Sequence, residues 1–273
     1  MEGKSRERIE LWREAKKEFP EDMSVLYELM YALQAHDRKA NADEIIEYGK
    51  QILERSTDSA LRDGVVQSLC FTYYYAKGDV QAAIKYANMA GIYSVTVNQL
   101  MPRLLEGDDA VVYCQTNIQE LVDLIGNNTN MMISKGRYTP AETVRACEFV
   151  LSCYRLLYPD GNYGFYHCRM SEYYEAMAMN YLRLGSEKEQ DVILCFEKAA
   201  QHAISFDTLT DGMYTAFMVN KVEMRAADAV RNHGENQSAR LLKALMSEPL
   251  MPLHKNIRMQ NVIKKLKPVA IMR

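Results

Sequence analysis

Proline and glycine are scarce in this sequence, and patterns typical of β-structure are missing. Only 7 of the 273 residues are proline and 13 are glycine. The segments between them are rich in Ala, Leu, Met, Glu, Lys and Tyr, with apolar residues three and four positions apart. No segment alternates apolar and polar residues between Asn-Gly or Asp-Gly turns, which excludes a β-hairpin or a Rossmann-type sheet. The sequence therefore predicts an all-α fold.

Long apolar runs and a dominant charge are also missing. No stretch approaches the roughly 18 uninterrupted apolar residues of a membrane span, and the N-terminus lacks the apolar core of a signal peptide. The 33 Lys and Arg residues nearly balance the 36 Asp and Glu residues, so the overall charge does not favour nucleic-acid binding. The six cysteines form no Cys-x-x-Cys pair, as is typical of reduced thiols. We expect a cytoplasmic protein without membrane contact.

Motifs that carry chemistry are absent as well. The sequence has no P-loop, no Gly-x-Gly-x-x-Gly after a strand, no His-Glu-x-x-His and no Gly-x-Ser-x-Gly. His167 and Cys168 are adjacent, so one helix face does not present both to one site. We therefore expect no enzyme activity, no metal site and no cofactor. An enzyme with an unrecognised helical site is the least favoured alternative.

Self-similar segments predict antiparallel helix pairs of about 34 residues, the length of a tetratricopeptide repeat. The clearest copy spans Ser59 to Ser94, with a turn at Gly78-Asp79 and small residues where the helices cross. These small residues are Ala83, Ala87 and Ala90. A second copy spans Tyr166 to Phe206, turns at Gly185 and carries the stripe Val192, Phe196 and Ala199. A third, weaker copy spans Met23 to Leu53, and residues 6–20 look like the second helix of a further repeat.

The repeats and the segments between them predict one tetratricopeptide-like α-α superhelix over residues 1–273. Its expected parts are N-terminal repeats (1–95), irregular inserted helices (96–160), a C-terminal repeat (161–210), and a loop with a capping helical hairpin (211–273). One inserted helix has a clear start signal, with Thr139 as N-cap, Pro140 at the first helical position and Glu142 at the third.

The first helix of each pair lines the concave surface of such a solenoid, where a peptide or a partner helix binds. Counted back from the turns, the residues expected to face this groove are Tyr27, Tyr31, Gln34, Ser68, Thr72, Tyr75, Glu172, Glu175 and Met179. Tyrosine offers a large contact area and a hydrogen-bonding tip at low entropy cost. The alternative is that each tyrosine is half-buried packing.

A Gly-rich aromatic turn, YPDGNYGFYH, leads into the helix that carries His167 and Arg169. One hypothesis is that His167 senses protonation or, together with Arg169, anchors a ligand carboxylate. The alternative is structural: Tyr163, Phe165 and Tyr166 wedge the inserted helices against the final repeat.

Several tracts resemble a known family: LCFTYYYAKGDVQAAIKYANMAG, YPDGNYGFYHCRMSEYYEAMAMNYLRLG, FEKAAQHAISFDTL and the C-terminal hairpin. They are similar to the effector region of Xre-class (phage-repressor-like) helix-turn-helix transcriptional regulators of Gram-positive, especially clostridial, bacteria. In that family a short DNA-binding domain precedes a tetratricopeptide-like region. No helix-turn-helix unit precedes the predicted solenoid in this sequence.

The resemblance implies that the chain is the sensor part of such a regulator. It would bind a short peptide or small effector in the groove, form a homodimer, and reach DNA only through the missing N-terminal domain. Ligand binding would favour one curvature of the solenoid and change the spacing of paired DNA-binding domains. The alternative is a tetratricopeptide scaffold that binds a partner protein in the same groove and has no link to DNA.

Overall fold

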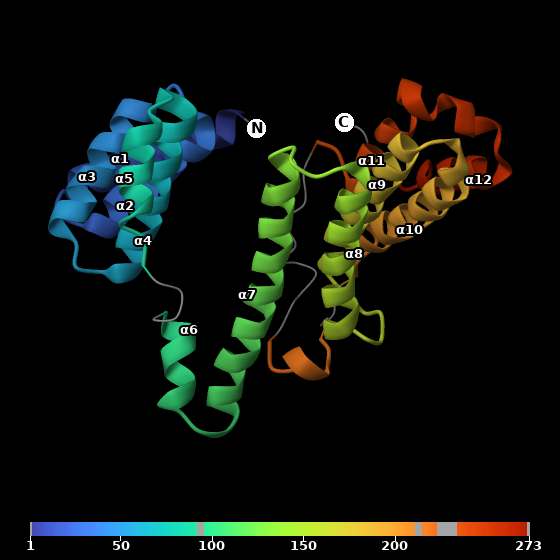
Figure 1. The fold of residues 1–273 in the computed structure, drawn as a ribbon. Helices are drawn as coiled ribbons and strands as arrows, with labels where there is room; N and C mark the ends of the chain where they lie inside the picture. Colours follow the sequence, from blue (N-terminus) through green and yellow to red (C-terminus); the bar gives the residue numbers. More distant parts are fainter. Residues whose placement is uncertain (1, 92–95, 211–214, 223–233, 272–273) are drawn as a thin grey trace. The chain divides into compact units, whose positions relative to one another are not determined.

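The computed structural model is all-helical (Figure 1). It describes residues 2–91, 96–210, 215–222 and 234–271, and these ranges contain no β-strand. The prediction of an all-α fold is therefore confirmed. The helices form two compact units, unit 1 (residues 1–96) and unit 2 (residues 97–273), where the sequence predicted one continuous solenoid. The division lies one residue from the expected end of the N-terminal repeats.

In unit 1, each helix packs against the next one along the chain, and α2 also lies against α4. The elements are α1 (Glu2–Glu18), α2 (Met23–Asp37), α3 (Ala42–Arg55), α4 (Ser59–Phe71), the π-helix η1 (Thr72–Lys77) and α5 (Val80–Ala87). Apolar residues at helical spacing, such as Leu29, Leu33, Ile45, Ile52 and Leu69, are fully buried and form the core. Helix α1 packs against α2. Ile9 of α1 is buried and Trp12 of α1 is partly buried in the core.

The predicted turn at Gly78-Asp79 is present. Gly78 has a φ of 67°, which suits a residue without a Cβ, and the Asp79 carboxylate caps α5 by accepting the amide of Ala82 at 2.9 Å. Of the small residues expected at the helix crossing, Ala83 is buried, but Ala87 and Ala90 are exposed. The reason is that α5 ends at Ala87 and no further described helix of unit 1 covers that face.

In unit 2, the long helix α7 packs against α8, α8 against α9, and α9 against α10 (Figure 1). The first elements are α6 (Val97–Leu100), η3 (Met101–Arg103), α7 (Gly107–Ser134), α8 (Pro140–Leu157) and α9 (Tyr166–Leu184). The later elements are η4 (Ser186–Lys188), α10 (Glu189–Asp207), η5 (Phe217–Val219), α11 (Gln237–Leu245), η7 (Glu248–Lys255) and α12 (Ile257–Leu266).

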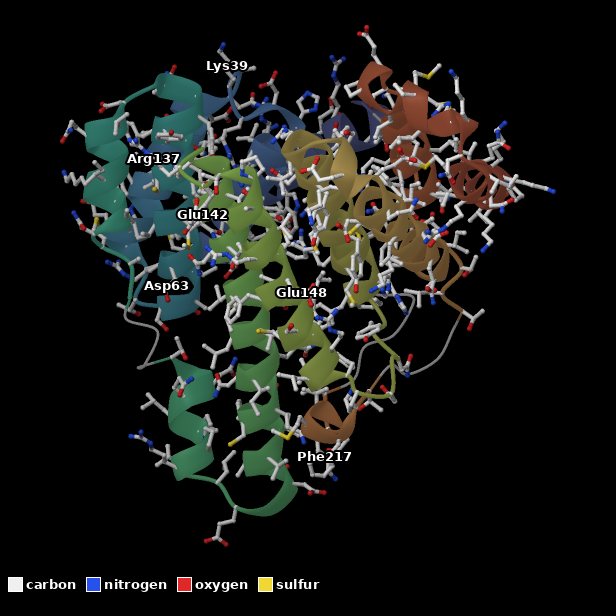
Figure 2. All side chains as sticks on the ribbon, turned by 45° about the vertical axis from the view of Figure 1, so that its right-hand side comes forward. Lys39, Asp63, Arg137, Glu142, Glu148 and Phe217 are labelled. Carbon is white, nitrogen blue, oxygen red and sulfur yellow. The ribbon has the colours of Figure 1, made fainter. Side chains whose placement is uncertain are left out.

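Two local predictions for unit 2 are confirmed. Helix α8 starts with a complete capping box: Thr139 Oγ1 accepts the Glu142 amide, and the Glu142 carboxylate accepts the Thr139 amide at 2.8 Å. Figure 2 labels Glu142. The stripe of Val192, Phe196 and Ala199 on α10 is fully buried. Side chains at these positions pack α10 into the core of unit 2.

The C-terminal hairpin consists of α11 and α12, and both helices pack against α10. Asp207, the last residue of α10, accepts the amides of Gln237 and Ser238 at 3.1 and 2.7 Å. Arg258 of α12 pairs with Glu197 of α10 at 2.6 Å. The loop expected before the hairpin falls partly on residues 211–214 and 223–233, which lie outside the described residues.

Within the described ranges, every helix is too short or too polar to cross a lipid bilayer. This agrees with the absence of long apolar runs in the sequence.

We predict that Leu151→Ala lowers the free energy of unfolding of unit 2 by about 2–5 kcal/mol, because it leaves a cavity in a tightly packed core. Leu151 is 0% exposed, whereas Leu156 on the same helix is 79% exposed. Leu156→Ala is therefore the matched control, with an expected change within about 0.5 kcal/mol. Urea unfolding followed by circular dichroism measures both variants. Equal stabilities of the two variants would contradict the packing of α8.

Candidate functional site

Helices α2 and α4 of unit 1 lie side by side through small and polar contacts. Gly64 of α4 leaves room for the Tyr27 hydroxyl, which a Cβ at this position would strike. One turn further on, the Ser68 hydroxyl donates a hydrogen bond to Gln34. Tyr27 stacks on Tyr31, with ring centroids 6.5 Å apart. Tyr27 and Gln34 therefore hold the two helices together, and Tyr31 is left exposed beside them.

Helix α4 continues into a π-helix, and this changes which residues face outward. The groove was expected to contain Ser68, Thr72 and Tyr75. In the structure, Ser68 is buried on the α-helical part of α4, where it contacts Gln34 of α2, and Thr72 is buried at the start of the π-helix. Tyr75 is 65% exposed. The i→i+5 bonding of a π-helix widens the turn, so α-helical spacing does not hold from Thr72 to Lys77. A π-helical turn often marks a functional site.

Aromatic side chains at the end of α4 and in the π-helix are exposed, and the groove assignment missed them. Phe71 is 39% exposed and Tyr74 is 47% exposed. The rings of Phe71 and Tyr74 lie 5.9 and 4.8 Å from the Tyr75 ring. The guanidinium of Arg38, at the end of α2, lies 5.9 Å from the Phe71 ring centre. The run FTYYYAK was the available signal, but its π-helical geometry was not readable from the sequence.

We call the exposed residues Tyr31, Phe71, Tyr74 and Tyr75, together with Arg38, the aromatic face of unit 1. On α2, Tyr31, Gln34 and Arg38 are spaced by three and four residues and share one side of the helix. Gln34 contacts Ser68, and Arg38 contacts Phe71. The aromatic face therefore continues from α2 across to α4 and η1.

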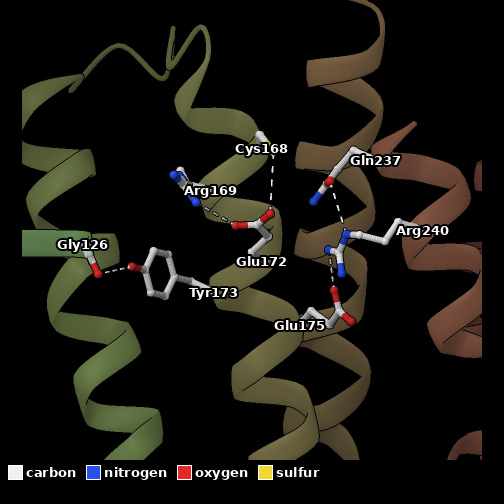
Figure 3. Close-up of polar contacts among 8 residues, drawn as sticks. All are labelled: Gly126, Cys168, Arg169, Glu172, Tyr173, Glu175, Gln237 and Arg240. Atoms are coloured by element: carbon white, nitrogen blue, oxygen red, sulfur yellow. Dashed lines mark hydrogen bonds and ion pairs between the residues drawn. The ribbon is translucent and has the colours of Figure 1, made fainter. Parts of the chain in front are cut away.

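The groove residues expected in unit 2 lie on α9, and their charges are paired within the unit. Figure 3 shows Glu172 beside Arg169, with an N–O distance of 3.5 Å, and Glu175 beside Arg240 of α11, at 2.6 Å. Tyr173 donates to the carbonyl of Gly126 on α7 at 2.9 Å. The contacts of Tyr173 and Glu175 connect α9 to α7 and α11. The carboxylates already have cationic partners.

Two further side chains of α9, Met179 and Cys168, are partly buried in unit 2. Met179 is partly buried and packs against the core of unit 2. Burial raises the pKa of the Cys168 thiol to about 12, so this cysteine is protonated at neutral pH and is a poor nucleophile. No set of three His, Cys, Asp or Glu side chains gathers as metal ligands would anywhere in the described ranges.

His167 does not join Arg169 but pairs with His202 of α10. The two Nδ1 atoms are 2.8 Å apart, so one imidazole donates and the other accepts. The Tyr163 ring meets both imidazoles edge-on, and Tyr174 stacks on His202. Burial lowers the pKa of His167 to about 4, and burial together with the neighbouring His167 and Lys198 lowers the pKa of His202 to about 4. The structure therefore separates His167 from the ligand-anchoring role expected beside Arg169.

The aromatic turn before α9 packs tightly against α8. The Tyr166 ring lies 4.7 Å from Tyr154 and 5.4 Å from Tyr158, and Tyr163 lies 6.3 Å from Tyr158. Tyr154, Tyr158 and Tyr166 are buried. This arrangement matches the structural alternative, in which the turn wedges the inserted helices against the final repeat.

No family model, no curated protein and no solved structure matches the chain at a significant level.

The histidine pair makes the stability of unit 2 sensitive to acid. A histidine in the unfolded chain titrates near pH 6.5, whereas both pKa values are about 4 in the folded chain. As the pH falls, the unfolded state takes up protons first, so stability is full above about pH 6.5 and falls towards about pH 4.

We predict that the melting temperature of unit 2 falls over this range and that His202→Gln flattens the dependence. Circular dichroism measures melting against pH. The single tryptophan, Trp12, reports unit 1 by fluorescence and serves as an internal control. The same slope in the variant and the natural chain would contradict the role of the pair.

Proposed function

We propose that this chain is the effector-binding region of a transcriptional regulator, and that unit 1 binds a short peptide on its aromatic face. The observation that carries the proposal is the group of exposed rings Phe71, Tyr74 and Tyr75 on α4 and η1, with Tyr31 exposed on the neighbouring helix α2. Exposed aromatic rings beside a cation are typical of adaptable recognition surfaces.

The succession of packed helices in each unit supports the repeat architecture that the family resemblance implies. A peptide on α2, α4 and η1 would bind more tightly to one arrangement of these helices and so favour it. In the proposed regulator, that population shift alters the spacing of paired helix-turn-helix domains, and the regulator acts as a homodimer. The link to DNA rests on the resemblance.

The exposed area of the rings gives the expected size of the binding free energy. An aromatic side chain buries about 200 Å² in full, and apolar burial stabilises by about 25 cal/mol per Å². A ring that is half exposed therefore contributes about 2 kcal/mol when a peptide covers it. Loss of one ring should weaken binding by roughly tenfold or more.

We predict that Tyr31→Ala and Tyr75→Ala each weaken peptide binding about tenfold, while the melting temperature of unit 1 changes by a few degrees at most. Phe19→Ala is the control, because Phe19 is an exposed aromatic residue in the turn between α1 and α2. Binding is measured by fluorescence anisotropy with labelled peptides. A large stability loss in both tyrosine variants would place them in the core and overturn the assignment.

Native mass spectrometry of the full chain purified from its own host tests the sensor function directly. The proposal predicts a dimer that carries a peptide-sized additional mass, and loss of that mass in Tyr75→Ala. A ligand-free monomer would contradict the proposal.

A further inference from the structure

Among the described residues, no carboxylate pairs with Arg38 of unit 1, and unlike Arg62 it donates to no backbone carbonyl either. Arg8, Arg13 and Arg55 each pair with a glutamate, at 3.0, 2.9 and 3.2 Å. Among the described residues, the Arg38 side chain has neither an ion pair nor a hydrogen bond, and its buried Nε lacks a partner. A buried N–H group without a partner is destabilising.

The acid nearest to Arg38 in sequence is already engaged. The Asp37 carboxylate accepts the backbone amides of Lys39 and Ala40, both at 2.9 Å. Lys39 points into solvent beyond the end of α2 and, among the described residues, has no ion pair (Figure 2). Arg38 and Lys39 thus have no ion pair among the described residues, and together with the Asp37 carboxylate they leave one net positive charge at the end of α2. Charge complementarity favours an anionic ligand here.

The aromatic rings extend to both sides of Arg38. Tyr31 lies seven residues before it on α2, a rise of about 10 Å. On the other side, Arg38 contacts Phe71, and Phe71 contacts Tyr75 at 5.9 Å. A ligand that covers these rings therefore continues past Arg38 in both directions. An acidic side chain inside a peptide fits this order better than a terminal carboxylate.

We propose that the aromatic face binds an extended peptide segment in which an acidic residue lies between apolar or aromatic residues, with Arg38 binding the carboxylate. An extended chain advances about 3.3 Å per residue. The rise from Tyr31 to Arg38 therefore spaces the acidic residue about three positions from the residue that covers Tyr31. This inference rests on the proposed peptide-binding function and adds the class of peptide.

The test uses the full chain and pooled heptapeptides with acetylated and amidated ends. Every pool has aromatic residues at the first and seventh positions, three residues from the centre. The central residue is Glu, Gln or Lys. We expect the Glu pool to bind about tenfold to a hundredfold more tightly than the Gln pool, because Arg–carboxylate contacts are strong charge-assisted hydrogen bonds. Arg38→Gln should remove this preference, and Arg38→Lys should keep part of it.

Arg55→Gln is the matched control, because Arg55 pairs with Glu21 and lies off the aromatic face. Circular dichroism checks that each variant is folded. Equal binding of the Glu and Gln pools, with loss in Tyr75→Ala, would overturn the acidic specificity and leave the proposed function standing. No binding of any pool would overturn both.

Two further arms identify other anions. A pool with a free C-terminus and a central Gln tests a terminal carboxylate, and competition by excess inorganic phosphate tests a phosphate ligand. Tighter binding of the free C-terminus than of the capped Glu pool, or displacement of the Glu pool by phosphate, would overturn the proposal.

Discussion

The contact between α2 and α4 is the interaction on which the aromatic face of unit 1 depends. Gly64 admits the Tyr27 hydroxyl, and the Ser68 hydroxyl bonds to Gln34. A Cβ at Gly64 would strike the Tyr27 hydroxyl and force this side chain to move, and loss of the hydrogen bond would leave polar atoms without partners. With the contact in place, the exposed sides of α2, α4 and η1 join into one surface.

Ion pairs connect helices in both units, whereas Arg38 lacks such a pair. In unit 2, Arg240 pairs with Glu175 and connects α11 to α9, and Arg258 pairs with Glu197 and connects α12 to α10. In unit 1, Arg38 has no carboxylate partner among the described residues and lies beside exposed rings. Paired charges mainly fix how helices pack, whereas an unpaired cation beside aromatic rings is available for recognition. The unpaired Arg38 beside exposed rings therefore favours unit 1 as the part of the chain that binds the peptide.

Local signals in the sequence predicted the elements well. The Gly78-Asp79 turn, the capping box at Thr139 and the buried stripe on α10 follow from backbone conformation, helix capping and apolar spacing. Each of these depends on a few neighbouring residues. They are therefore readable without tertiary information.

Features that depend on tertiary packing were not predicted. The π-helix at η1 buries Thr72 and exposes Tyr75, although α-helical spacing placed both on one side. The contact of Arg38 with Phe71 joins residues 33 positions apart, and His167 pairs with a histidine 35 positions away instead of with Arg169. Apolar spacing indicates which face of a helix is buried, but it does not identify the residue that meets it.

Hydrogen–deuterium exchange of the full chain with and without the Glu-centred peptide pool tests the location of binding most directly. Amides that a ligand covers or stabilises exchange more slowly. The account predicts new protection at the end of α2 and through η1, and loss of that protection in Tyr75→Ala. Protection confined to residues 97–273 would contradict it.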